Sequence, residues 1–230
     1  FLTQSAVLGM DLTFANSAIF ANNNAKENQM ITLNNGMSMP LLGYGVYQIP
    51  ADICERCVLD ALSVGYRSID TAKYYRNEQQ VGDAVKKSGI DRKDIFITSK
   101  IYSSGYNDSL RDIDDSVKKI GSYIDLMLIH WKIADDENTY RALEKAQADG
   151  KIKAIGISNY YCKDLQRIIQ AAKIKPVLNQ VECHIYYQQE KLRQFLQSSK
   201  MYLEAWSPFG GGGHSQELLS NKIIVLIAQK

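Results

Sequence analysis

Short apolar runs alternate with longer amphipathic segments along most of this chain, and this alternation limits the folds that it can adopt. Seven runs have the length of strands: 41–49, 67–71, 94–100, 124–130, 153–158, 177–182 and 201–206. The segments between them have the 3.6-residue apolar period of helices: 51–64, 77–88, 107–120, 137–149, 161–173 and 188–198. A last helical segment begins near Gln216 and continues to Lys230. Strands that alternate with helices predict crossover units and a parallel sheet.

The region before the first strand–helix unit has a different character. Residues 31–40 place the turn dipeptide Asn35-Gly36 between two short alternating stretches, which predicts a hairpin. Residues 1–29 hold apolar patches interrupted by polar residues, without the basic start and unbroken apolar stretch of a signal peptide. We therefore predict a weakly ordered extension over 1–29 and one folded domain over 30–230.

Two parallel architectures fit the alternation: an open doubly wound sheet and a closed (β/α)8 barrel. An open nucleotide-binding sheet carries G-x-G-x-x-G after its first strand, and residues 43–48 do not complete that pattern. The residues that close successive strands favour the barrel: they are Asp70, Lys100, His130, Asn159, Gln180 and Trp206, 21 to 30 residues apart. One unit of a ~250-residue barrel takes about 31 residues, and such barrels carry their sites at consecutive strand ends.

The number of strands leaves the predicted barrel incomplete at its C-terminal end. Counting from 41–49, the sequence contains seven strands, so we expect a C-terminally truncated (β/α)8 barrel whose bottom is closed by the hairpin. The edges of the first and seventh strands would then face each other across two strand spacings, roughly 10 Å. Exposed edges and a cavity beside them predict that the chain is unstable or aggregation-prone alone.

Composition excludes several classes of function. Lys and Arg number 27 and Asp and Glu 25, and this net charge of +2 is too small for a nucleic-acid-binding surface. The longest apolar run, 223–228, is much shorter than the ~20 residues of a membrane span. Cys54 and Cys57 form a C-x-x-C, which is typical of a redox pair or half a zinc site. Their helical surroundings instead favour two thiols on a buried helix face, and we predict no metal site.

Six motifs occur in order at the predicted strand ends. They are Ile69-Asp-Thr-Ala-Lys-Tyr-Tyr-Arg-Asn-Glu, Ile97-Thr-Ser-Lys, Leu128-Ile-His-Trp, Gly156-Ile-Ser-Asn, Asn179-Gln-Val-Glu-Cys-His and Ala205-Trp-Ser-Pro-Phe-Gly. Together they resemble the aldo-keto reductases, in particular the diketogluconate-reductase and prostaglandin-synthase-like members. The resemblance runs from about Met30 to Lys230. It implies a barrel enzyme that reduces aldehydes or ketones to alcohols with NADPH or NADH.

Four side chains at these strand ends could carry carbonyl reduction. The reaction needs a hydride, which no side chain supplies, and a proton donor. Tyrosine titrates near 10, but a neighbouring ammonium lowers that pKa, so Lys100 could turn Tyr75 into a usable acid. Asp70 would keep Lys100 charged and oriented, and His130 could hydrogen-bond the substrate oxygen. The resemblance implies the same catalytic roles for Asp70, Tyr75, Lys100 and His130.

Adjacent Tyr74 is an alternative acid, although the spacing D-T-A-x-x-Y selects Tyr75. The other three residues also have ordinary structural explanations. Alone, Asp70 would be interpreted as a helix cap, Lys100 as a solvated rim residue and His130 as a hydrogen-bonded core histidine. Their joint occurrence on three consecutive strands favours the catalytic interpretation.

The remaining strand ends predict a cofactor site and a substrate wall. Ser158, Asn159 and Gln180 offer hydrogen-bond partners to a nicotinamide carboxamide, and Trp206 offers a ring to stack on it or is simply a packed aromatic. The cofactor-binding residues that the resemblance implies are Val46, Asp70, Ser158, Asn159, Gln180, Trp206, Ser207 and Phe209. The substrate-binding residues that it implies are Tyr47, Tyr102, His130 and Trp131.

The chain departs from the family pattern in its loops and at its end. Lys132 and Ile185 stand where the family usually has proline, which predicts reshaped loops. The glycines at 210–213 resemble a loop that contacts pyrophosphate, with a flexible linker as the alternative. The family's basic segment for the 2′-phosphate of NADPH is not found in this sequence. We therefore expect weak cofactor binding or none, and no sequence basis for preferring NADPH over NADH.

Two functions follow from these observations. The first is an NADP-dependent aldo-keto reductase acting on a small carbonyl substrate, expected to be a cytoplasmic monomer without nucleic-acid or membrane partners. The second is a non-catalytic aldo-keto-reductase-like fragment that serves as a binding or regulatory subunit. The four catalytic residues favour the first function, and the missing tail favours the second.

Overall fold

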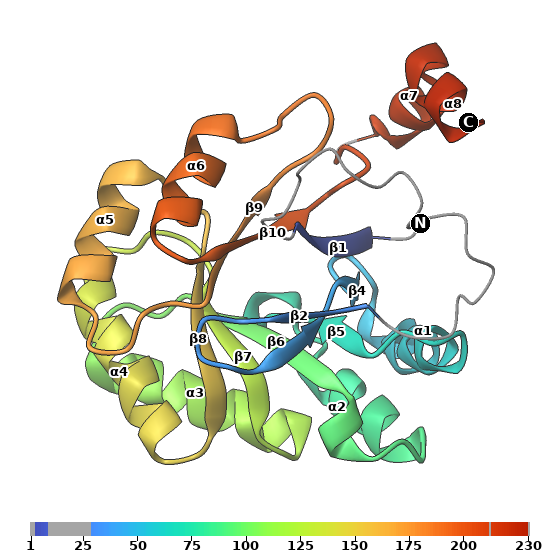
Figure 1. The fold of residues 1–230 in the computed structure, drawn as a ribbon. Coiled ribbons are helices and arrows are strands. Elements are labelled where there is room, and N and C mark those ends of the chain that lie inside the picture. Colours follow the sequence, from blue (N-terminus) through green and yellow to red (C-terminus); the bar gives the residue numbers. More distant parts are fainter. Residues whose placement is uncertain (1–2, 9–28, 212, 230) are drawn as a thin grey trace.

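The computed structural model describes residues 3–8, 29–211 and 213–229. Its centre is a closed barrel with the strand order β1-β10-β9-β8-β7-β6-β5-β4 (Figure 1). The parallel strands are β4 (Leu42–Gly45), β5 (Ser68–Asp70), β6 (Phe96–Ile101), β7 (Ile124–Ile129), β8 (Ile152–Ser158), β9 (Leu178–Glu182) and β10 (Tyr202–Trp206). All seven match predicted strands. Neighbours in the sequence are neighbours in the barrel, so the predicted sequential order is confirmed.

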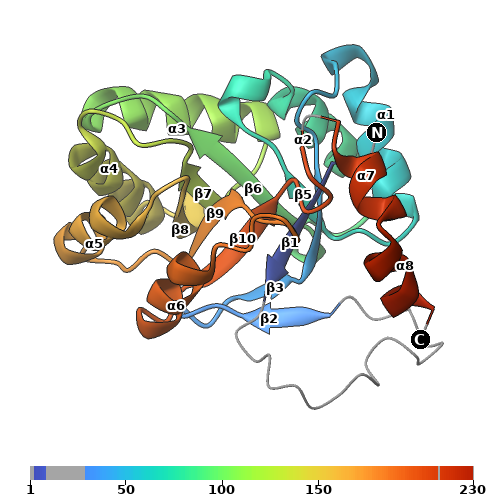
Figure 2. The ribbon, with the colours of Figure 1, turned by 90° about the horizontal axis from the view of Figure 1, so that it is seen from above.

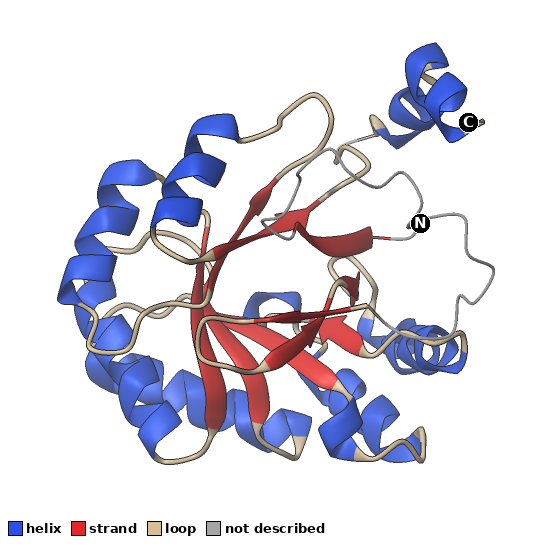
Figure 3. Ribbon diagram, in the orientation of Figure 1, coloured by secondary structure: helices blue, strands red, loops and turns tan. Residues whose placement is uncertain are grey.

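Helices cover the outside of this strand layer (Figure 3). They are α1 (Ala51–Ser63), α2 (Glu78–Lys87), α3 (Tyr106–Ile120), α4 (Asp136–Ala148), α5 (Cys162–Ala171) and α6 (Glu190–Ser198), with short 3-10 turns η1 (Lys73–Tyr75) and η2 (Arg92–Asp94). Their apolar faces pack on the strands to form the larger core of the protein. In the described part of the chain, no helix combines the length and apolar character needed to cross a membrane.

The C-x-x-C pair lies on α1, as predicted. Cys54 is completely buried, Cys57 is half-buried, and all four cysteines are free thiols. Burial raises the pKa of Cys54 to about 12, and the neighbouring Cys57 adds to this rise. Because the thiolate is the reactive form of cysteine, this pKa makes Cys54 a packing residue and not a redox group.

The last predicted helix is divided in two. Helix α7 (Ser215–Ser220) ends before Asn221, and α8 (Lys222–Ala228) begins directly after it. The side chain of Asn221 accepts a hydrogen bond of 2.9 Å from the backbone N–H of Ile223. Asparagine is a favourable N-cap because its oxygen satisfies an N–H that the first turn leaves without a partner. This cap starts a new helix inside the segment that periodicity alone predicted as continuous.

The barrel is closed by a segment from the beginning of the chain, which was not predicted. Strand β1 (Thr3–Leu8) is antiparallel to both neighbours: Ala6 to Leu8 pair with β10, and Thr3 to Ala6 pair with β4. Figures 1 and 2 show β1 beside β10 at this closure. The expected gap between the first and seventh parallel strands is therefore wrong, and so is the expectation that this segment lies outside the domain. The rest of the expected extension, 9–28, is outside the described residues.

The predicted hairpin closes the bottom of the barrel. It consists of β2 (Met30–Thr32) and β3 (Ser38–Pro40), and Gly36 supplies the positive φ of 84° that the turn between them requires. Leu33 and Met39 are buried against side chains from the parallel strands: Phe96, Leu126, Leu128 and Leu178. This second apolar cluster fills the lower end of the barrel, so the open end is the one at which the parallel strands finish.

Candidate active site

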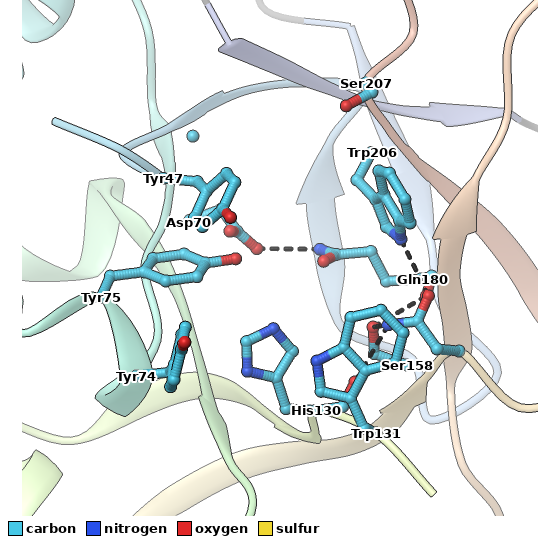
Figure 4. A pocket seen from close by; sticks show the side chains of 12 residues that line it. Tyr47, Asp70, Tyr74, Tyr75, His130, Trp131, Ser158, Gln180, Trp206 and Ser207 are labelled. Carbon is cyan, nitrogen blue, oxygen red and sulfur yellow. Dashed lines mark hydrogen bonds between the residues drawn. The ribbon is translucent and has the colours of Figure 1, made fainter. Parts of the chain in front are cut away.

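A cavity of about 340 Å³ opens at the carboxyl ends of the parallel strands (Figure 4). Its lining residues are Gly45, Tyr47, Asp70, Tyr74, Tyr75, His130, Trp131, Ser158, Asn159, Gln180, Trp206 and Ser207. They come from strand ends or the residues that follow them. The predicted ring of strand-end side chains is thus assembled around one cavity, where a barrel carries its chemistry.

Lys100 lies beneath this cavity, and only 1% of its surface is exposed. Its Nζ donates to Asp70 Oδ1 and to the Thr71 carbonyl at 3.0 Å, and lies 3.4 Å from Tyr75 Oη. Burial is the largest influence and by itself would lower the pKa of Lys100, but Asp70, Tyr75 and Glu204 together hold that pKa above its usual value. A buried ammonium is stable only with such a partner. Lys100 is therefore a charged group directed at the Tyr75 hydroxyl.

The structure distinguishes the two adjacent tyrosines. Both lie in the 3-10 turn η1, in which successive side chains point about 120° apart, so only one can face Lys100. That one is Tyr75. Tyr74 is 60% exposed, and its ring packs edge-on against Tyr102 with centroids 5.8 Å apart. Tyr75 is also the tyrosine that the spacing D-T-A-x-x-Y selects, and its catalytic role stays a prediction.

The pKa of Tyr75 differs from the expectation. Burial of the phenol raises its pKa, and this is the largest influence; Lys100 lowers it, as expected, and the net result is a pKa above the usual value. The neighbouring charge acts on Tyr75 as expected from the sequence, but the loss of hydration on burial outweighs it. Tyr75 is therefore protonated at neutral pH.

His130 follows β7 and faces the same space. Its ring centroid is 5.6 Å from that of Tyr75 and 5.9 Å from that of Trp131, on which it stacks. Burial and the nearby Lys100 lower the pKa of His130 to about 3. Its Nδ1 atom is buried and has no hydrogen-bond partner among the described residues. At neutral pH His130 is therefore an uncharged hydrogen-bonding group and not an acid.

This neutral histidine predicts how stability depends on pH. An unfolded histidine titrates near 6.5, so as the pH falls the unfolded chain takes up this proton first, and His130 in the folded chain takes it up only near 3. We expect the protein to lose about 4 kcal/mol of unfolding free energy from this group between pH 6.5 and 3. His130→Gln should lose correspondingly less. Urea denaturation at pH 7 and pH 4 measures these losses, and equal losses in the wild type and His130→Gln would contradict the assignment.

Hydrogen bonds connect the other side chains of the cavity. The indole N–H of Trp206 donates to Asn159 Oδ1 at 3.0 Å, and Asn159 Nδ2 donates to Ser158 Oγ and to the His130 carbonyl, both at 3.0 Å. Asn159 has a left-handed φ of 63°, which asparagine tolerates better than most residues. Gln180 Nε2 donates to Asp70 Oδ2 at 2.8 Å. This last bond, drawn in Figure 4, connects Gln180 to Asp70, the residue that holds Lys100.

Some predicted site residues lie outside the cavity lining. Val46 is completely buried, and its backbone N–H donates to the carbonyl of Asp70 at 2.9 Å. Phe209 and Tyr102 are exposed beside the cavity and do not line it. Gly210 packs on α7, where an added Cβ would lie 2.6 Å from Leu218 Cδ1. Val46 thus supports the strand that carries Asp70, and its predicted role in cofactor binding stays a prediction.

Sequence reasoning missed one buried acidic residue next to the site. Glu204 lies in β10 with 2% of its surface exposed. Side chains alternate between the two faces of a strand, so Glu204 shares the face of Trp206, which lines the cavity. A glutamate between Leu203 and Ala205, two positions before a predicted site residue, is the signal that could have identified it.

Comparison with known proteins places this arrangement in a family. The model of the aldo/keto reductase family matches residues 39–223. A glyoxal reductase of Bacillus subtilis is 42% identical over 205 residues, which cover 87% of this chain and 73% of that protein. The crystal structure of an aldo/keto reductase from Brucella melitensis is 42% identical with a TM-score of 0.82, covering 88% of this chain and 79% of that one.

A third relative was crystallised with its cofactor. A variant of Gox0644 in complex with NADPH is 34% identical to this chain, with a TM-score of 0.80, and the match covers 88% of this chain and 74% of that one. The family match spans well over half of the chain, and the relatives share both the sequence and the fold. This chain, with its barrel and its strand-end cavity, therefore belongs to the aldo/keto reductase family.

Proposed function

We propose that this protein reduces small aldehydes or ketones to alcohols with NADPH, and that Tyr75 donates the proton. The observation that carries the proposal is the approach of the buried Lys100 Nζ to Tyr75 Oη, 3.4 Å, while the same nitrogen is held by Asp70. No packing requirement explains an ammonium 1% exposed under an open cavity. Its charge is useful where negative charge develops on the phenol during proton transfer.

The proton step follows from these contacts. A carbonyl oxygen beside Tyr75 Oη would accept its proton as the oxygen gains negative charge, and the phenolate left behind would lie next to the Lys100 ammonium. Because Lys100 is buried, this interaction is stronger than in bulk water. His130 would donate a hydrogen bond to the same oxygen and set its position. Since the pKa of His130 is about 3, it holds no extra proton at neutral pH, which supports Tyr75 as the donor.

The Trp206 side of the cavity fits the nicotinamide ring of NADPH. Asp70 takes one N–H of the Gln180 amide, so that amide is oriented before any ligand arrives. Ser158 and Asn159 add a hydroxyl and an amide on the adjacent strand end, and Trp206 presents a half-buried ring whose edge is fixed by Asn159. These groups match a flat ring that carries a carboxamide. When bound, NADPH supplies the hydride, and the NADPH complex of the Gox0644 variant supports this cofactor.

The rest of the lining supports a small substrate. Tyr47, Tyr74 and Trp131 form aromatic walls around a cavity of about 340 Å³. The similarity to a glyoxal reductase also supports a compact carbonyl compound as substrate. We include in the proposal that the enzyme is a monomer and that it is cytoplasmic. Four free thiols support the cytoplasmic location, because a reducing compartment keeps thiols unpaired.

Turnover with simple carbonyl compounds tests the proposal directly. The purified protein is given NADPH with glyoxal, methylglyoxal or benzaldehyde, and the alcohol product is identified by mass spectrometry. We expect NADPH consumption matched by alcohol formation. A folded protein that binds NADPH and forms no alcohol from any of these would contradict the proposal and favour a non-catalytic binding subunit.

The two tryptophans of the cavity separate cofactor binding from substrate binding. Trp206→Ala should weaken NADPH binding about tenfold, because loss of a stacking partner costs ~1 kcal/mol or slightly more. Trp131→Ala, which changes the ring stacked on His130, should leave the NADPH dissociation constant unchanged and raise KM for the carbonyl substrate. Titration of NADPH fluorescence gives the first quantity and steady-state kinetics the second. A Trp206→Ala protein with unchanged NADPH affinity would contradict the placement of the nicotinamide.

A further inference from the structure

Glu204 is a buried carboxyl group that the proposed reaction does not use. It lies in β10 directly opposite Gln180 of β9 in the strand register. The Gln180 amide acts on the Glu204 carboxyl and favours its charged form, and Gln180 Nε2 donates to Asp70 Oδ2 at 2.8 Å. Asp70 in turn holds Lys100, whose Nζ lies 3.4 Å from Tyr75 Oη. Strand pairing and these bonds connect Glu204 to Tyr75.

The charges around Glu204 do not balance. The titratable groups that act on it are Asp70 from β5 and Lys100 from β6, with the uncharged Gln180 from β9. On its other side lies β1, and the sequence of Thr3–Leu8 contains no titratable residue. When Glu204 is ionised, the buried cluster of Glu204, Asp70 and Lys100 contains two carboxylates and one ammonium. The Oε2 atom of Glu204 has no hydrogen-bond partner among the described residues.

Burial therefore opposes the ionisation of Glu204. Burial raises the pKa of this carboxyl to about 7, Asp70 adds to the rise, and the Gln180 amide and Lys100 partly offset it. A buried carboxyl with this pKa weakens the fold above neutral pH, which a glutamine or leucine at the same place would not do. A group that costs stability next to the catalytic residues is a candidate for a role in the reaction.

We propose that Glu204 is a positioning residue that makes the proton donor of the site sensitive to pH. When Glu204 is uncharged, Lys100 faces one carboxylate, and its positive charge favours the phenolate that Tyr75 forms on giving up its proton. When Glu204 loses its proton to solvent, a second negative charge reaches Lys100 and Gln180. The phenolate is then stabilised less, so proton donation to the carbonyl slows. The inference rests on the proposed function.

The first part of the test needs no activity. The unfolding free energies of the wild type and of Glu204→Gln are measured in urea between pH 5 and 8.5. The folded carboxyl titrates near 7 and the unfolded one near 4.5, so its contribution is largest at low pH and is lost as the pH rises through 7. We expect the wild type to lose stability relative to the variant over this range. Parallel curves would overturn the inference.

The second part measures kcat for carbonyl reduction over the same pH range. We expect kcat of the wild type to fall by about three- to tenfold through neutrality, and that of Glu204→Gln to stay level. Leu203→Ala is the matched control: this neighbour in β10 is also buried but is on the other face of the strand. Leu203→Ala should lower the unfolding free energy at every pH, and its kcat should depend on pH as that of the wild type does. A Glu204→Gln protein with the wild-type profile would overturn the inference.

If Glu204→Gln does not fold, the ionisation of Glu204 is followed in the wild type by infrared titration. One buried carboxyl that loses its proton near pH 7 supports the inference, and none overturns it. A wild type that shows the stability difference but no turnover with any carbonyl compound would refute the proposed function, and with it the effect on proton donation. The titration of Glu204 would still be established by the stability difference.

Discussion

Replacement of Tyr75 by phenylalanine is expected to lower kcat for carbonyl reduction by about 10²- to 10⁴-fold, the usual contribution of a positioned proton donor. The variant removes one hydroxyl from a ring whose position is also supported by Tyr47, at 5.0 Å between centroids, and by His130. The fold and the Trp206 side of the cavity should therefore remain intact. Stopped-flow or steady-state measurement of NADPH oxidation gives kcat, and NADPH fluorescence gives the affinity for the cofactor, which should change less than twofold.

The adjacent Tyr74 provides a close control. Tyr74→Phe makes the same chemical change one residue away, on a ring that is 60% exposed and packs on Tyr102. We expect kcat to stay within about twofold of the wild type. Equal losses in the two variants, or turnover retained by Tyr75→Phe, would contradict the assignment of Tyr75. A fall in NADPH affinity as large as the fall in kcat would show that the hydroxyl serves in binding and not in proton transfer.

Removal of β1 is expected to have the largest effect on stability. Without Thr3–Leu8, the facing edges of β4 and β10 lose their partners along the whole closure. Each backbone hydrogen bond contributes about 0.5–1.5 kcal/mol, so the loss of such a ladder should cost about 5 kcal/mol, comparable with the ~5–15 kcal/mol that stabilises a typical domain. We expect a chain that lacks residues 1–8 to aggregate or to melt without cooperativity, as measured by circular dichroism and size-exclusion chromatography.

A point substitution tests the same closure in the full chain. Ala6 is the one residue of β1 that pairs with both β10 and β4 in the described register, so its backbone lies between two strands. Ala6→Pro removes a backbone N–H donor from the interior of a sheet and should cost about 3 kcal/mol or more. Ala6→Gly keeps the donor and should cost only about 1 kcal/mol. Equal urea midpoints for the two variants would show that β1 does not close the barrel.

Most of the barrel could be predicted because its parallel strands are buried on both faces. Such strands appear in the sequence as continuous apolar runs, of which Ile124–Ile129 is a clear case. Strand β1 gave no such signal: Thr3–Leu8 reads Thr-Gln-Ser-Ala-Val-Leu, without a sustained apolar run or alternation. Its partners Leu42–Gly45 and Leu203–Ala205 are far away in the sequence. Pairing between distant segments depends on which edges the rest of the fold leaves open, and local patterns do not contain that information.

In the candidate site too, local sequence predicted some features, and others depend on contacts between distant segments. The positions of Asp70, Lys100 and His130 were predictable because the end of each strand fixes where its last side chains lie. The pKa of Tyr75 was not, since burial of its ring depends on residues from several loops. Glu204 was missed because a single acidic residue in a strand has no meaning until its neighbours across the barrel are known. Residue types predicted the chemistry, and packing decided how strongly each group is perturbed.

The direction of β1 has a practical consequence. The seven parallel strands bring their carboxyl ends to the rim of the cavity, whereas β1 brings its amino end there, since Thr3 pairs with Gly45 and Gly45 lines the cavity. An affinity tag or fusion partner attached ahead of β1 would leave the barrel at this rim, within reach of incoming ligands. A tag attached after α8 leaves from a helix outside the strand layer. Cofactor affinity should therefore be measured on protein that carries its tag after α8, or on protein from which a tag ahead of β1 has been cleaved.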